Sequence, residues 1–585
     1  MSEPPTFTPT PATIPAATPT AAAAATEVLR LDGALTRLDA FARAGFAVPA
    51  YDVARMRERT TTHPAWVHLG PGNFFRSLHA TVAQQLLDAG AMDTGIVLVG
   101  THDPRTIEHC HETDELFVNA VMDADGGIAP SLVASVAESH FLSAGTAEAW
   151  TRLIEVFTAP SLQLVTLTIT EKGYKLRDPS GDLLPAAAYD VEHGPGDDTH
   201  AIGVLTALLL ERYRAGALPI AVVSTDNFSA NGLRLAASVG ELAELWAVRG
   251  FVDDAFLGYL RDPARVAFPW SMVDRITPVP SPRVAEALGC LGLADTALVP
   301  REGASPLASF SNTEEISYLV IEDTFPNGRP PLERGGVRLA DRETVNRADR
   351  MKVCTCLNPL HTAMAVVGCL LGYTSIAQEI RNPDILGLVR GIGYDEGLPV
   401  VADPGIISPG DFLDEVVTRR FPNPGIPDTP QRIATDTSQK VAIRFGETLK
   451  AHAARGTGTS LRCIPFAIAA WVRYLLAVDD EGRPFRLSPD PLADYLHGFV
   501  NGIRLGDPAS VGDRLRPLLS NAEVFGIDLY AAGVGPTVEG YVRELVAGPG
   551  AVARTLHRVV TDSTLTANST LTTDHDLTTE GADER

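Results

Sequence analysis

The segment richest in chemically useful side chains is Lys352-Val-Cys-Thr-Cys-Leu-Asn358-Pro-Leu-His361, with an amine, an amide and an imidazole within ten residues. Lysine can release its proton where arginine cannot. Asparagine and histidine supply hydrogen bonds to a reacting oxygen. Such a set suits acid/base chemistry at a substrate hydroxyl. The segment also fits a plainer interpretation, in which Asn358 caps a helix before a first-turn proline and His361 is a core residue.

Lysine is scarce in this chain. Of 48 basic residues only five are lysine, at positions 172, 175, 352, 440 and 450. Arginine therefore carries nearly all of the positive surface charge, and a lysine that is kept is somewhat more informative than usual.

A second group of residues is typical of a nucleotide-binding turn. Gly70-Pro-Gly72 ends an apolar run, and Asn73 and Phe74 open a helical stretch from about Phe75 to Asp88. Glycines there let the backbone turn tightly and approach a pyrophosphate, which then sits at the helix N-terminus. The third glycine of the usual fingerprint is missing, so an ordinary strand-to-helix turn fits as well.

Asp103 follows the next apolar run, GIVLVG. An acidic side chain at that place accepts hydrogen bonds from the adenosine ribose, which favours NAD over NADP without excluding NADP. The alternative is an aspartate that caps the helix beginning at Pro104.

Other polar residues stand where strands or helices would otherwise simply pack. Asn227 ends the apolar run PIAVVSTDN, and Asp274 lies in FPWSMVDRITP. The carboxyl ends of parallel strands are where such sheets place ligands. Arg432 and Lys440 are eight residues apart, so a helix would put both on roughly one side. Each of these residues also has an ordinary surface interpretation.

The cluster Glu108-His-Cys-His-Glu112 contains metal-binding residue types. On a helix, however, His109 and His111 are about 200° apart and cannot share one ion. No metal site is expected from it.

Apolar runs at 65–70, 95–100, 162–170 and 219–227 alternate with helical stretches such as 200–214. Continuous Val/Ile/Leu runs separated by helices favour a parallel sheet covered on both faces. Beyond about 340 the strand signal fades and amphipathic helices follow. The predicted fold is α/β, with a Rossmann-like dinucleotide-binding domain over 27–335 and a mostly α-helical substrate and catalytic domain over 336–561. Tails at 1–26 and 562–585 are expected to be disordered, because their composition is poor in large apolar residues.

Charge and composition exclude several classes of function. The 48 basic and 72 acidic residues give a net charge of -24, which argues against nucleic-acid and anionic-membrane partners. We find no apolar run of about 18 to 20 residues and no secretory signal. Six scattered cysteines do not form a disulfide framework, so a cytoplasmic location is the simplest expectation.

Six stretches together resemble the mannitol dehydrogenase family of polyol-specific long-chain dehydrogenases, which includes fructuronate and tagaturonate reductases. In chain order they are VHLGPGNFFR, LTITEKGY, VVSTDNFSANG, FPWSMVDRITP, MKVCTCLNPLH and FPNP-PDT-RIATDTSQK, spread over about 65 to 480. The resemblance implies zinc-independent hydride transfer between NAD(P) and a secondary hydroxyl.

The resemblance also implies roles for single residues. Lys352 would be the general acid/base, and Asn227, Asn358 and His361 would contact the reacting oxygen. A second set would hold the rest of the substrate, namely Asp274, Arg432 and Lys440.

The spacing departs from the family at one point. The commoner family spacing has four residues between the lysine and the asparagine, and here five separate Lys352 from Asn358. In a straight helix the extra residue turns the lysine by about 100°. Pro359 cannot donate to the carbonyl of Thr355. We therefore predict a π-bulge or a break near 355–359 that returns Lys352 to the Asn358/His361 face.

The sequence thus predicts an NAD-dependent dehydrogenase of a C6 sugar acid or polyol, acting as a monomer or homodimer on a small-molecule substrate. D-Mannonate/D-fructuronate is the favoured pair, because the TEKGY segment and two cations suit a carboxylate. Mannitol/fructose and tagaturonate are the alternatives. A non-catalytic nucleotide-binding sensor is the alternative from another class.

Overall fold

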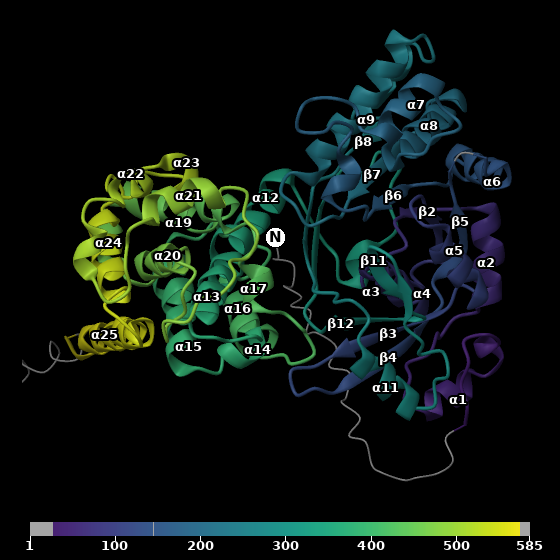
Figure 1. Cartoon of the computed structure of the whole chain (residues 1–585). Helices are drawn as coiled ribbons and strands as arrows, with labels where there is room; N and C mark the ends of the chain where they lie inside the picture. Colours follow the sequence, from purple (N-terminus) through teal and green to yellow (C-terminus); the bar gives the residue numbers. More distant parts are fainter. Residues whose placement is uncertain (1–26, 144, 574–585) are drawn as a thin grey trace, which may run out of the picture.

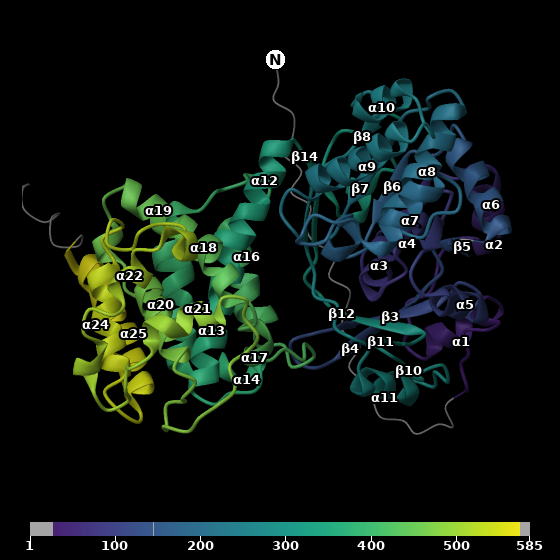
Figure 2. The same cartoon turned by 45° about the horizontal axis from the view of Figure 1, so that its top comes forward.

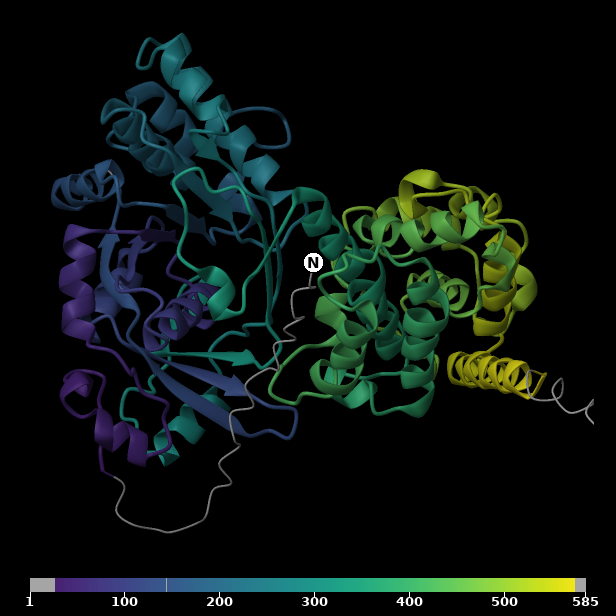
Figure 3. The ribbon, with the colours of Figure 1, turned by 180° about the vertical axis from the view of Figure 1, so that it is seen from behind.

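The computed structural model describes residues 27–143 and 145–573, with side chains described as far as residue 562. The predicted tail over 1–26 lies outside the described residues, as does 574–585. Figure 1 shows an α/β lobe and a helical lobe side by side, with α12 (Arg342–Met351) at their boundary. The view from behind in Figure 3 shows the same two lobes.

The α/β lobe is built on a six-stranded parallel sheet in the order β5-β2-β1-β6-β7-β8. Numbered along this sheet alone, that order is 3-2-1-4-5-6, the doubly wound dinucleotide-binding topology. The order reverses between β1 and β6, which makes the crevice there the expected ligand site. The strands are β5 (Val136–Phe141), β2 (Ile96–Gly100), β1 (Trp66–Leu69), β6 (Leu164–Leu167), β7 (Ile220–Ser224) and β8 (Val266–Ala267).

Both faces of this sheet are buried. Val67 and Leu69 of β1 pack in one core cluster with side chains of α6, α8 and α9. Trp66 packs in another cluster, on the side of α4. Alternating side chains of one strand thus enter two cores, which is why the strands read as continuous apolar runs. The helices around the sheet are α2 (Val53–Thr62), α4 (His79–Asp88), α5 (Pro104–Glu112), α6 (Ala147–Thr158), α7 (Pro185–His193), α8 (Ala201–Arg214), α9 (Asn231–Val248) and α10 (Asp254–Arg261).

Smaller sheets extend this lobe toward the helical lobe, and Figure 2 shows β12, β3 and β4 beneath the main sheet. One sheet has the order β12-β3-β4, another β14-β13-β9, and β10 pairs with β11. The strands are β3 (Phe117–Met122), β4 (Ile128–Val133), β9 (Ser271–Asp274), β10 (Val299–Arg301), β11 (Ala304–Leu307), β12 (Phe310–Glu314), β13 (Tyr318–Glu322) and β14 (Arg338–Ala340), with α1 (Leu38–Arg43) and α11 (Pro282–Cys290) beside them.

The helical lobe packs around α13 and α20, whose side chains are almost all buried in one core. The predicted fold class is confirmed. The helices of the helical lobe are α13 (Asn358–Leu370), α14 (Ile376–Glu379), α15 (Pro383–Arg390), α16 (Pro409–Glu415), α17 (Pro430–Ile433), α18 (Val441–Arg444), α19 (Gly446–Ala454), α20 (Cys463–Tyr474), α21 (Ala493–Val500), α22 (Arg516–Leu519), α23 (Ala522–Phe525), α24 (Gly535–Leu545) and α25 (Ala551–Thr573).

Three expectations from the sequence about helical segments need correction. The helical stretch predicted from Phe75 is two helices, α3 (Asn73–Ser77) and α4, which meet at Leu78. Helix α25 continues to Thr573, past the boundary expected at 562. The span Arg342–Leu370 is long and apolar enough to cross a membrane, although no such run was expected. Because 83% of its most apolar window is buried, it is a core helix.

Candidate active site

The turn after β1 lies in the crevice where the strand order reverses. Gly70 has φ of +115°, and a Cβ there would lie 2.2 Å from the carbonyl oxygen of Thr168, at the end of β6. A Cβ on Gly72 would meet nothing within 4 Å. Only glycine therefore fits the first position, and the second leaves open space for a ligand to approach the backbone. Both features fit the pyrophosphate of a dinucleotide.

Phe75 takes the place of the third glycine of the fingerprint. Its ring stacks on His68 at a centroid distance of 4.4 Å. Burial lowers the pKa of His68 well below its usual value and that of His79 to about 3, so both imidazoles are neutral. His68 also bonds Thr168 through Nε2 (2.9 Å), and the Thr168 hydroxyl donates to the Gly70 carbonyl (3.2 Å). Through Thr168, the neutral imidazole of His68 is linked by hydrogen bonds to the glycine turn.

Asp103 caps α5, because its Oδ1 accepts from the backbone N–H of Arg105 at 3.1 Å. The same carboxylate pairs with the guanidinium groups of Arg105 and Arg301, each at 3.1 Å. These contacts hold its pKa below the usual value, chiefly through the hydrogen bond from Arg105. The capping alternative is thus observed, and the predicted contact with ribose stays a prediction.

The amine of Lys352 lies at the junction of the two lobes, and its residue is 2% exposed. Its Nζ donates to Oδ1 of Asn227 (2.6 Å), directly after β7, and to the carbonyl of Val273 (2.8 Å) in β9. Asp349 Oδ1 lies 3.5 Å from this amine, and the other carboxylate oxygen of Asp349, Oδ2, accepts from the Ser229 hydroxyl at 2.5 Å. The α/β lobe therefore supplies two fixed acceptors for an amine that belongs to the helical lobe.

A π-helical turn is present as predicted, although it begins earlier, at Lys352, and the shared face of Lys352 with Asn358 and His361 stays a prediction. Residues Lys352–Cys356 form a π-helical turn, η4, between α12 and α13. The N–H of Leu357 donates to the carbonyl of Lys352 at 3.1 Å, a bond that spans five residues. The extra residue before Asn358 is therefore absorbed in one widened turn.

His361 lines a cavity with residues of the helical lobe and with Ile276. Burial, opposed by Asp428 and aided by nearby arginines, lowers the pKa of His361 to about 4. Its Nε2 has no hydrogen-bond partner among the described residues and lies 3.7 Å from Asp428 Oδ2. The side-chain amide of Asn358 likewise makes no hydrogen bond to a described residue. A neutral imidazole and a free amide are thus available to a ligand.

Asp274 is held by Arg420, a residue that the sequence analysis did not single out. Arg420 is almost fully buried and bonds Asp274 and Glu314 at 2.8 Å each, across the two lobes. Its third nitrogen, Nη2, is buried without a partner among the described residues. Arg420 also lines the cavity of His361, so β9 links that cavity to Lys352 through its consecutive residues Val273 and Asp274. The arginine follows a helical run, and nothing in the sequence pattern marks it as buried.

Arg432 and Lys440 do not share one helix, which corrects the reason given for grouping them. Asp436 between them has φ of +54°, and α17 ends at Ile433. Arg432 is bound by both carboxylate oxygens of Asp428 (2.7 and 2.6 Å). The Lys440 amine donates to the backbone carbonyls of Ile433 and Thr435. Asp428, missed in the sequence, is the residue that ties Arg432 to the cavity of His361.

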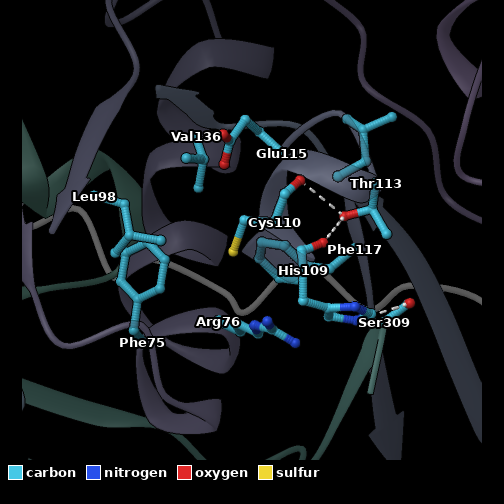
Figure 4. A pocket seen from close by; sticks show the side chains of 11 residues that line it. Phe75, Arg76, Leu98, His109, Cys110, Thr113, Glu115, Phe117, Val136 and Ser309 are labelled. Atoms are coloured by element: carbon cyan, nitrogen blue, oxygen red, sulfur yellow. Dashed lines mark hydrogen bonds between the residues drawn. The ribbon is translucent and has the colours of Figure 1, made fainter. Parts of the chain in front are cut away.

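A separate cavity lies within the α/β lobe (Figure 4) and shares no lining residue with the one at His361. The His109 ring in its lining lies 3.1 Å from the Ser309 hydroxyl, while Oε2 of Glu115 is buried without a partner among the described residues. Burial raises the pKa of the Cys110 thiol, which keeps it protonated. The neighbouring ring of His111 bonds the Ser139 carbonyl instead (3.1 Å), so the two histidines diverge. No group of three or more potential metal ligands occurs in the described part of the chain.

Comparison with known proteins places this geometry in a family. The model of the mannitol dehydrogenase Rossmann domain matches residues 64–334, and that of the mannitol dehydrogenase C-terminal domain matches 345–539. A D-mannonate oxidoreductase of Thermotoga maritima is 46% identical over 89% of this chain and 97% of its own. The chain belongs to the mannitol dehydrogenase family. It is therefore an oxidoreductase, and a nicotinamide dinucleotide is its cofactor.

Other members of the mannitol dehydrogenase family agree with this assignment. A mannitol 2-dehydrogenase of Cereibacter sphaeroides is 31% identical over 74% of this chain and 84% of its own. The solved ternary complex of Pseudomonas fluorescens mannitol 2-dehydrogenase with NAD and D-mannitol is 28% identical, with a TM-score of 0.63 over 88% of this chain and 97% of that one.

Proposed function

We propose that the protein interconverts D-mannonate and D-fructuronate, with NAD as the hydride carrier. The observation that carries the proposal is the buried amine of Lys352, fixed by Asn227 and Val273 where the lobes meet. The similarity to a D-mannonate oxidoreductase at 46% identity supports the choice of substrate.

In the proposed mechanism Lys352 is the general acid/base. As a neutral amine it uses its two N–H groups for Asn227 and Val273, and its lone pair is left for the hydroxyl proton of the substrate. As an ammonium it keeps a third N–H for the ketone oxygen in the reverse direction. The bound nicotinamide supplies the hydride acceptor or donor. Asn358 and His361 have free hydrogen-bonding groups that suit a developing alkoxide.

The rest of the substrate would lie along Asp274, Arg432 and Lys440. Asp274 accepts Arg420 with one oxygen, Oδ2, which leaves the other for a sugar hydroxyl. Gly70, Gly72, Asn73 and Phe74 would hold the pyrophosphate end of the cofactor.

The choice of NAD rests on Asp103, whose carboxylate suits the two ribose hydroxyls and repels a 2′-phosphate. Two arginines already partner this carboxylate, and arginine is what a 2′-phosphate prefers. Asp103→Ala should therefore lower the Kd for NADPH relative to NADH, as measured by fluorescence titration. An unchanged ratio would assign cofactor choice to other residues.

The test of the substrate is a panel of fructuronate, tagaturonate and fructose with NADH, followed by absorbance. Fructuronate should give the highest kcat/KM. A higher value with fructose would make the protein a mannitol dehydrogenase, and a higher value with tagaturonate a tagaturonate reductase. Cofactor binding without any turnover would point to a nucleotide sensor.

A further inference from the structure

Helix α18 lies beside both parts of the proposed catalytic set. It packs against the π-helical turn η4 that begins at Lys352, and against α13, whose first turn carries Asn358 and His361. Its last residue is Arg444, whose Nη1 donates to the hydroxyl of Thr362 at 2.5 Å. Thr362 is fully buried and directly follows His361. The guanidinium therefore reaches the helix turn that presents the imidazole.

Arg444 is a half-buried cation without an ion-pair partner among the described residues. The bond to Thr362 is its one side-chain hydrogen bond to the described residues, and no described carboxylate lies within 4 Å of it. Burial alone lowers its pKa to about 10. A guanidinium has five N–H donors. Leaving most of them without an acceptor at a partly desolvated position costs free energy.

Three fully buried arginines of the chain have several acceptors each. The guanidinium of Arg212 donates to five backbone carbonyls. Arg473 donates to three, and Arg420 binds two carboxylates. Each of them has several fixed acceptors within the protein. Arg444 has a single hydroxyl, so its remaining donors are free to receive something that the protein itself does not supply.

The surroundings of Arg444 favour a negative occupant. Lys440 lies one helical turn earlier, with its amine on backbone carbonyls and no carboxylate within 4 Å among the described residues. Burial lowers the pKa of Lys440 and of His361, and the charge of Arg444 adds to this, while Asp436 and Asp490 act in the opposite direction on Lys440 and Asp428 does so on His361. Helix α18 thus brings two cations to the outer side of the turn that carries His361.

We propose that Arg444, aided by Lys440, binds the carboxylate of a sugar-acid substrate whose reacting carbinol lies at Lys352. A planar guanidinium with free donors matches a carboxylate in a bidentate manner. The arrangement would make Arg444 the residue that selects acids over neutral polyols and ketoses. This inference rests on the proposed function and assigns its substrate selectivity to a named side chain.

The test compares one acid and one neutral substrate in the same enzyme. In Arg444→Gln, kcat/KM for fructuronate reduction should fall about 100- to 1,000-fold, the size expected for a lost charge-assisted pair. The value for fructose should change less than about threefold. Arg444→Lys should recover at least about tenfold for fructuronate, because it keeps the charge without the fork. The matched control is Arg455→Gln, a change of an exposed arginine directly after α19 that bonds a backbone carbonyl, and it should leave kcat/KM for both substrates unchanged.

The outcomes separate this inference from the proposed function. An equal fall with both substrates, or no fall with fructuronate, would overturn the role of Arg444 while leaving fructuronate as the preferred substrate of the wild type. If the wild type prefers fructose, the proposed function fails. Inhibition of fructose reduction by D-gluconate then tests the role of Arg444. If Arg444 binds the carboxylate, the Ki of D-gluconate must rise about 100-fold in Arg444→Gln. An unchanged Ki would refute carboxylate binding by Arg444.

Discussion

Lys352 and Asn227 are 125 positions apart in the chain, and their side chains meet at 2.6 Å across the boundary of the two lobes. The acid/base group belongs to one lobe and the group that orients it to the other. Activity therefore depends on how the lobes are joined as well as on each fold.

Replacing Lys352 with alanine should lower kcat/KM about 100- to 10,000-fold, because the proton carrier is lost. NADH affinity should stay within about threefold of the wild type, since the glycine turn is untouched. Steady-state kinetics and fluorescence titration measure the two quantities. Lys450→Ala, an exposed lysine paired with Glu447, is the control. Full activity in Lys352→Ala would mean a different proton carrier.

Gly70→Ala and Gly72→Ala form a matched pair. At position 70 the methyl group would collide with the Thr168 carbonyl, and the alanine would have to adopt a positive φ. Thermal unfolding should therefore show that the free energy of unfolding falls by about 2 kcal/mol or more. At position 72 there is room for the methyl group, so stability should hold while NADH affinity falls. Unchanged NADH affinity in Gly72→Ala would place the pyrophosphate elsewhere.

The pH profile of kcat/KM should show no step from His361 between pH 5.5 and 8.5. Its pKa of about 4 keeps the imidazole neutral across that range. His361→Asn should lower the rate and leave the shape of the profile unchanged. An acid limb near pH 6.5 that disappears in this variant would contradict the neutral form.

Arg420→Met should destabilise the protein by about 3 to 5 kcal/mol, because it strands the buried carboxylates of Asp274 and Glu314. The midpoint of urea unfolding would report this loss. Its neighbour Arg419 pairs with Glu315 at the surface, so Arg419→Gln should cost less than about 1 kcal/mol. Similar effects of the two substitutions would show that the buried pairings contribute little.

Glu379 makes stability depend on pH. Its carboxyl group is fully buried, neither oxygen has a partner among the described residues, and burial raises its pKa to about 9. The unfolded chain ionises near the usual 4.5. The native state thus holds a proton that the unfolded state lacks, and stability falls as pH rises from about 5 to 9, by up to about 1.4 kcal/mol per pH unit.

Glu379→Gln removes that proton linkage. The variant should show a flatter dependence of Tm on pH and should be the more stable protein at pH 8 to 9. Glu343→Gln, a change on the exposed face of α12, is the control and should follow the wild type. Parallel curves for Glu379→Gln and the wild type would show that Glu379 is ionised in the folded protein.

The main sheet was predictable because a strand buried on both faces must be an unbroken apolar run, as at Val97 to Val99. The π-helical turn was predictable because a known spacing was exceeded by one residue next to Pro359. The small sheets were not predictable, since their strands are short and pair with distant segments: β12 with β3, for example. The environments of Arg420 and Arg444 could not be predicted for a related reason. In a chain so rich in arginine, only the packed structure distinguishes a buried guanidinium from a surface one.

The π-helical turn at Lys352–Cys356 also bears on how such enzymes diverge. A widened turn confines an inserted residue to a single loop of the helix, so the flanking turns keep their packing partners. The position of the Lys352 amine then no longer depends on the exact number of residues between Lys352 and Asn358. Sequence searches that demand a fixed lysine-to-asparagine interval would pass over relatives whose catalytic geometry is intact.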